Sequence, residues 1–74
     1  METIDSRAIE YRGYLILVIH RHPFYQGIIK PTKAGMARVD WTLNPIWAPN
    51  RTEVEMDARI RIDRTLARAA LSPH

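Results

Sequence analysis

Residues 8–20 have the sequence AIEYRGYLILVIH, in which apolar residues occupy both alternating sets of positions. Branched and aromatic side chains dominate this stretch, and such side chains favour strands. We predict one strand over residues 8–20, and we place its end before His22-Pro23, because proline has no backbone N–H for a sheet ladder. Since both rows of this strand are apolar, a single covering layer buries only one of them.

Two shorter stretches complete the predicted sheet. Residues 25–30 form a second strand, and residues 36–42 form a third because their apolar side chains alternate with polar ones. The pentapeptide PTKAG between them has proline early and glycine late, as a turn does. The three strands make an antiparallel meander. Residues 1–6 are polar and show no period, so we expect them to be flexible.

Residues 53–63 allow two interpretations. Apolar and charged residues alternate there, which fits a strand with one buried face. A helix is favoured because a capping box can follow Pro49 and because acids precede arginines at helical spacing. The capping candidates are Asn50 with Glu53 and Thr52 with Glu55, and the i,i+4 pairs are Glu55 with Arg59 and Asp57 with Arg61. We predict a helix over residues 52–71.

These elements predict one α+β domain over residues 1–74, a three-stranded antiparallel sheet followed by one C-terminal helix packed on one face, in the order β-β-β-α. A domain of this size buries only about 60% of its unfolded surface, so its core is thin. The second apolar row of the first strand needs a cover, and three are considered: an extended loop over residues 43–50, the N-terminal segment or another molecule. The predicted interface residues are Tyr14, Ile16, Val18 and Trp47.

Positive charge is concentrated in the predicted sheet. The chain has a net charge of +3, and residues 7–38 contain six Lys and Arg residues against Glu10 alone. With aromatic side chains interleaved, such a surface can contact phosphates and stack bases; the ordinary alternative is that basic residues keep a small sheet soluble. The candidate nucleic-acid contacts are Arg12, Arg21, Lys30, Lys33 and Arg38. Arg61, Arg64 and Arg68 are interpreted as the solvated face of the helix.

The sequence offers little for catalysis or for a cofactor. There is no cysteine, which removes disulfides, thiol nucleophiles and Cys-based zinc sites. His20 and His22 point the same way on a strand and could share a metal with Asp40, but two histidines make no site, and we expect no metal, no cofactor and no catalytic residue. We therefore expect a protein that is not an enzyme. No apolar run is long enough to span a bilayer, and we expect a cytoplasmic protein that does not contact membranes.

Two motifs resemble known families. YRGY at residues 11–14, YQGIIKP at residues 25–31 and a late helix with Ala58, Ile62 and Asp63 resemble small bacterial proteins of β-β-β-α order that have no established activity. The layout is more distantly similar to the three-stranded DNA-binding domains of plant ethylene-response factors and to integrase arm-binding domains, whose sheet contacts the major groove. Where the ethylene-response family alternates arginines that reach bases, this chain has Tyr14-Leu15-Ile16-Leu17, which cannot hydrogen-bond to a base edge. The resemblance implies the fold and not the activity.

Two functional hypotheses follow from the sequence. The first is a small interaction module that binds a protein partner or a second copy of itself, as a homodimer, through the sheet face that the helix leaves uncovered. The alternative is nucleic-acid binding through the basic sheet and hairpins.

Overall fold

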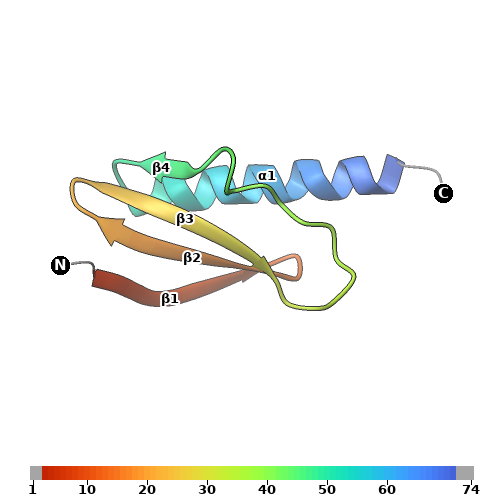
Figure 1. Cartoon of the computed structure of the whole chain (residues 1–74), viewed down its shortest axis with the longest axis horizontal. Coiled ribbons are helices and arrows are strands. Elements are labelled where there is room, and N and C mark those ends of the chain that lie inside the picture. The colour runs from red at the N-terminus through yellow and green to blue at the C-terminus, as the bar shows by residue number, and fades with distance from the viewer. Residues whose placement is uncertain (1–2, 72–74) are drawn as a thin grey trace.

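Two successive hairpins and one short edge strand form the sheet, and a single helix covers it (Figure 1). The computed structural model describes residues 3–71, with side chains from residue 8 onward. All neighbouring strands are antiparallel, and their order in the sheet is their order in the chain. The elements are β1 (Thr3–Tyr11), β2 (Tyr14–Arg21), β3 (Phe24–Pro31), β4 (Ile46–Ala48) and α1 (Arg51–Leu71).

The predicted class is confirmed: the chain is an α+β domain with an antiparallel sheet followed by one C-terminal helix. The prediction of one strand over residues 8–20 was wrong, because a two-residue turn at Arg12-Gly13 divides this stretch into β1 and β2. Both turn residues have positive φ angles, 51° and 87°, and this geometry matches the twist of the paired strands. Residues 3–6, expected to be flexible, belong to β1, while residues 1 and 2 lie outside the described residues.

The prediction of a third strand over residues 36–42 was also wrong. These residues belong to the irregular loop 32–45, and β4 takes the edge position beside β3 instead. The alternation that suggested a strand comes from packing, since Val39 is buried and Trp41 packs against the core. Tyr14 donates a hydrogen bond to the carbonyl oxygen of Ala37, which fixes the loop to the sheet.

The helix prediction is confirmed, including the choice of helix over strand for residues 53–63. The side-chain oxygen of Asn50 accepts a hydrogen bond from the backbone N–H of Glu53 at 2.9 Å, so Asn50 is the N-cap. Asp57 and Arg61 form the expected i,i+4 pair at 3.0 Å. With the first turn fixed in this way, α1 begins at Arg51.

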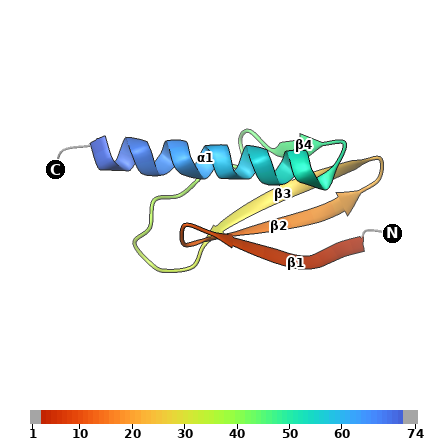
Figure 2. The same ribbon diagram turned by 180° about the vertical axis from the view of Figure 1, so that it is seen from behind.

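One face of the sheet contacts α1 and carries the core. Val54, Ala58 and Ile62 of α1 are fully buried against β2, β3 and β4. Gly27 of β3 allows this close approach, because a Cβ there would lie 2.8 Å from Cγ1 of Val54. Both views show α1 along one side of the sheet and running past the tip of the β1–β2 hairpin (Figures 1 and 2). The helix therefore covers a single face, which we call the inner face.

Candidate functional site

The opposite face of the sheet, called the outer face here, has no covering layer among the described residues. Strand register places Ala8, Leu17 and Ile28 in one row across β1, β2 and β3, and Leu15 and Ile19 lie before and after Leu17 on β2. Because successive side chains of a strand alternate between faces, the sequence itself fixes the members of this surface. Its members are Ala8, Glu10, Leu15, Leu17, Ile19, Arg21, Phe24, Gln26, Ile28, Lys30 and Trp47.

Burial separates the two faces of β2. Tyr14, Ile16 and Val18 on the inner face are at most 1% exposed, whereas Leu15 and Leu17 on the outer face are only partly buried. The prediction that Tyr14, Ile16 and Val18 form an interface was therefore wrong, because α1 and the loop 32–45 already cover that row.

Trp47, the fourth predicted interface residue, does lie on the outer face. It was expected in an extended loop over the core edge, but it is the central residue of β4, opposite Gln26 of β3. Its neighbours in the strand, Ile46 and Ala48, face α1 and are buried, while Trp47 itself is 48% exposed. Phe24, on the same face, is 47% exposed. Two large aromatic side chains thus add to the apolar surface of the outer face.

Charged residues stand at both ends of one row of this face. Glu10 of β1, Leu15 of β2 and Lys30 of β3 are cross-strand neighbours, and both charged side chains are exposed. Glu10 and Lys30 lie two strand spacings apart with Leu15 between them, and their side chains extend from the same face rather than toward each other. Neither forms an ion pair with another residue of the described part of the chain.

The five predicted nucleic-acid contacts do not form one patch. Arg12, Lys30, Lys33 and Arg38 lie toward the end of the sheet where Tyr14 pairs with Pro31. Arg21 lies at the opposite end of β2, about 20 Å away along the strand.

Arg12, moreover, is part of a cluster that joins the β1–β2 turn to α1. Arg12 donates to Oδ1 of Asp63 at 2.8 Å, and the hydroxyl of Tyr11 donates to the same oxygen at 2.9 Å. Arg59 lies over the Tyr11 ring, 5.6 Å from its centre. These four residues are called the hairpin cluster, and the YRGY motif and Asp63, noted separately in the sequence, contact each other in it.

The hairpin cluster shifts the acidity of its members. The hydrogen bond from Arg12, followed by that from Tyr11, lowers the pKa of Asp63 below its ordinary value of 3.8. The hydrogen bond to Asp63 is the largest cause of the raised pKa of Tyr11 and also of the raised pKa of Arg12. Tyr11 is therefore kept protonated as a donor and Asp63 charged as an acceptor, which is a structural role.

The histidines are placed away from any carboxylate cluster. The ring of His20 stacks on Tyr25 with 4.4 Å between ring centres, and the ring of His22 lies edge-on to His20 at 6.0 Å. Asp40 lies at the other end of the sheet and accepts backbone hydrogen bonds from Thr42 and Leu43. Among the residues the structure describes, no three His, Cys, Asp or Glu side chains are close enough to hold a metal ion.

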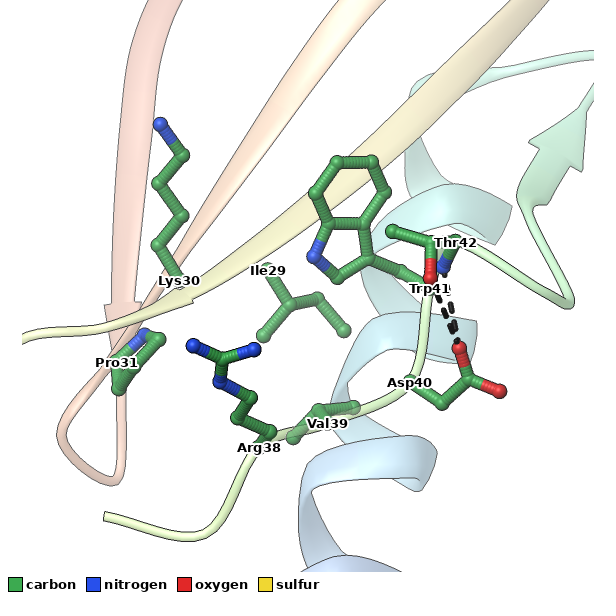
Figure 3. A pocket seen from close by; sticks show the side chains of 8 residues that line it. All are labelled: Ile29, Lys30, Pro31, Arg38, Val39, Asp40, Trp41 and Thr42. Atoms are coloured by element: carbon green, nitrogen blue, oxygen red, sulfur yellow. Dashed lines mark hydrogen bonds between the residues drawn. The ribbon is translucent and has the colours of Figure 1, made fainter. Parts of the chain in front are cut away.

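Within the described part of the chain, hollows lie around the loop 32–45. One of them, about 460 Å³, has an apolar floor that includes Ile29 and Val39, and Trp41 and Arg38 form part of its wall (Figure 3). Two others lie between the loop and α1. Arg68 lines both and Arg64 lines one of them, although the sequence had assigned both arginines to a solvated helix face. Arg61 from the same stripe donates to the carbonyl oxygens of Asp40 and Asn44 and so fixes the loop to the helix.

The chain has no match among protein-family models, curated proteins or solved structures. The resemblances noted in the sequence therefore stay predictions. No helix within residues 3–71 is both long and apolar enough to cross a membrane.

Sequence reasoning found that one apolar row of the sheet stays uncovered but chose the wrong row. Alternation alone assigns Leu15, Leu17 and Ile19 to one face and Tyr14, Ile16 and Val18 to the other, but it does not say which face receives the helix. A signal for the choice was present at Gly27, since a glycine inside a strand often marks the close approach of another element. Trp41 and Arg64 were missed because their hollows depend on the path of an irregular loop.

Proposed function

We propose that this protein is a non-enzymatic interaction module that forms a homodimer through the outer face of its sheet. The observation that carries the proposal is the apolar row Leu15, Leu17 and Ile19, which no other described element covers. An apolar sheet face of this kind is stabilised by a second layer. Phe24 and Trp47 extend the same surface with exposed aromatic area.

The size of the exposed surface supports a second copy as the covering layer. The chain has 5477 Å² of accessible surface, while a folded monomer of 8.6 kDa is expected to have about 4,700 Å². The excess, about 800 Å², is close to what each partner buries in an interface of standard size. The uncovered outer face contributes to this excess.

The charges of the outer face favour a particular symmetry. A two-fold axis parallel to β2 superposes the β2 strands of two subunits and places β1 of one over β3 of the other. Glu10 then faces Lys30 of the partner subunit, and the symmetry repeats this contact at the other edge. Two sheets packed face to face lie within about 30° of alignment, a deviation that these long side chains can span. The apolar row lies between the two ion pairs and excludes water from the centre.

The test compares one substitution inside and one outside the outer face. Leu17→Lys places a charge at the centre of the face, and Leu43→Lys places the same charge on loop 32–45, where the leucine is 89% exposed. In sedimentation velocity at micromolar concentration we expect dimers for the native chain and for Leu43→Lys, and monomers for Leu17→Lys. A native chain that stays monomeric, or a Leu17→Lys variant that is folded by circular dichroism and still dimeric, contradicts the proposal.

A further inference from the structure

Three arginines from two segments surround the hollows between loop 32–45 and α1. Arg38 belongs to the loop, and Arg64 and Arg68 lie one turn apart on the helix. The two hollows have volumes of about 330 and 270 Å³ and share Thr65, Arg68 and Asp40 as lining residues, so they form one continuous surface. We call this surface the arginine groove.

The three arginines are not used by the fold. Within residues 8–71, none of them makes a hydrogen bond or an ion pair, in contrast to Arg61, which binds Asp57 and two loop carbonyl groups. The charge of Asp57 is thereby compensated by Arg61. One further carboxylate, that of Asp40, lines the groove, and it accepts hydrogen bonds from backbone N–H groups of its own loop. The groove therefore keeps an excess of positive charge.

Like charges at i,i+4 destabilise a helix, and Arg64 and Arg68 have this spacing. Arg38 adds a third positive charge from the loop. A bound anion with several negative charges relieves the repulsion among all three at once. Guanidinium groups also donate in a fork that matches two oxygens of a phosphate, so a phosphate-rich ligand fits this arrangement.

An aromatic surface continues the groove. The 460 Å³ hollow shares Arg38, Val39 and Asp40 with the arginine groove, and Trp41 forms part of its wall. Figure 3 shows the indole of Trp41 and the guanidinium of Arg38 on either side of Ile29, while Asp40 turns away toward Thr42. A base can stack on a partly exposed indole, and a cation beside the indole can contact the phosphate of the same nucleotide.

We propose that the arginine groove binds single-stranded nucleic acid, with backbone phosphates on Arg38, Arg64 and Arg68 and one base stacked on Trp41. A single strand is favoured over a duplex because only an unpaired base offers its face to the indole. The proposal does not depend on the homodimer, since Arg38, Trp41, Arg64 and Arg68 all lie off the outer face, and only Lys30 of that face also lines the 460 Å³ hollow. It also differs from binding through the sheet, which would use the exposed arginines and lysines of the strands and turns.

The test is fluorescence anisotropy with labelled single-stranded DNA and RNA, with duplex DNA and with polyglutamate, over a range of salt concentrations. Arg38→Gln combined with Arg68→Gln removes two phosphate contacts and is expected to weaken single-strand binding at least about ten-fold at low salt. The slope of log K against log salt becomes shallower by about 1.4, because each contact contributes about 0.7. The matched control, Lys33→Gln with Arg59→Gln, removes two exposed cationic side chains that belong neither to the groove nor to the outer face, and it is expected to leave binding unchanged.

Fluorescence of Trp41 provides the second readout. In a Trp47→Phe background only Trp41 remains as a tryptophan, and a stacked base is expected to quench its emission on binding. Trp41→Phe keeps an aromatic ring, and its affinity for the single strand is expected to fall by less than about ten-fold. Trp41→Ala has no ring, and its affinity is expected to fall by about ten-fold or more. Absence of single-strand binding at low salt, an equal loss in the Lys33/Arg59 control, or equally tight binding of polyglutamate or duplex DNA overturns the proposal.

Discussion

The two faces of β2 consist of similar residues and have opposite environments. Tyr14, Ile16 and Val18 are almost completely inaccessible beneath α1 and the loop 32–45, whereas Leu15 and Leu17 on the other face have no layer above them within the described chain. Hydrophobicity does not distinguish the two rows. What distinguishes them is the covering element, because α1 packs where Gly27 lets Val54 approach the sheet. The apolar content of a strand thus shows that two covers are needed, and local features of the neighbouring elements decide which row the chain covers itself.

The largest expected difference between the faces is in stability. Ile16→Ala removes a fully buried side chain and is expected to lower the free energy of unfolding by about 2–5 kcal/mol. Leu17→Ala on the outer face is expected to cost less than about 1 kcal/mol in the monomer, because its side chain is already partly solvated. Urea denaturation of dilute protein measures both values. Similar losses for the two variants would contradict the assignment of inner and outer faces.

The next effect tests why α1 selects the inner face. Gly27→Ala places a Cβ within 2.8 Å of Cγ1 of Val54 and is expected to destabilise the fold by about 1–3 kcal/mol. The companion change Val54→Ala removes the closest contact of this methyl group and leaves the contacts with Ile46 at 3.2 Å. The double variant is expected to be more stable than the sum of the single losses, by a coupling energy of about 1 kcal/mol in a double-mutant cycle. Purely additive losses would show that this close contact does not limit the approach of the helix.

A smaller effect is expected for the loop that completes the cover of the inner face. Tyr14→Phe keeps the buried ring and removes the hydroxyl that donates to the carbonyl oxygen of Ala37. The expected cost is about 0.5–1.5 kcal/mol, the net contribution of one hydrogen bond. Hydrogen exchange is expected to accelerate in residues 36–42 more than in β1. Uniform acceleration across the sheet would instead indicate that the hydroxyl stabilises the fold as a whole.

The hairpin cluster gives the smallest effect, and pH reveals it. The pKa of Asp63 is lowered in the folded protein. The charged carboxylate of Asp63 therefore stabilises the fold at pH values above its ordinary pKa of 3.8, and this stabilisation is lost as the pH falls through the pKa of the folded state. The pKa of Tyr11 is raised in the folded protein. The protonated hydroxyl of Tyr11 therefore stabilises the fold at pH values below its ordinary pKa of 10.0, and this stabilisation is lost as the pH rises through the pKa of the folded state. Asp63→Asn is expected to flatten the dependence of stability on pH at both ends. Thermal unfolding of both proteins from pH 2.5 to 11 measures this dependence. Identical profiles of melting temperature against pH for Asp63→Asn and the native chain would show that the hairpin cluster adds nothing to stability.

Much of the fold could be predicted from the sequence because the signals were local. The Asn50–Glu53 cap and the Asp57–Arg61 pair identified the helix, although residues 53–63 alternate like a strand. The β1–β2 turn was missed because its central residues are Arg12 and Gly13 rather than Asn-Gly, and because apolar residues continue on both sides. The short β4 was hidden between two prolines.

The candidate surfaces were harder to predict because they depend on tertiary structure. Trp41 alternates with Val39 as in a strand, but their shared orientation comes from a loop that packs on the core. Arg61, Arg64 and Arg68 form one stripe in the sequence, and only the position of loop 32–45 separates Arg61, which binds the loop, from the two that line the groove without a partner. Pattern predicts which residues share a face, and the fold decides what that face contacts.

The most direct test of self-association through the outer face exchanges its two charges. Glu10→Lys and Lys30→Glu each place like charges opposite each other in the proposed dimer, whereas a mixture of the two variants restores both opposite-charge contacts. Sedimentation equilibrium of each variant alone and of the equimolar mixture is the measurement. We predict that the mixture dimerises at least about ten-fold more tightly than either variant alone, which corresponds to about 1.4 kcal/mol. A mixture that associates no better than its components would contradict the proposed interface.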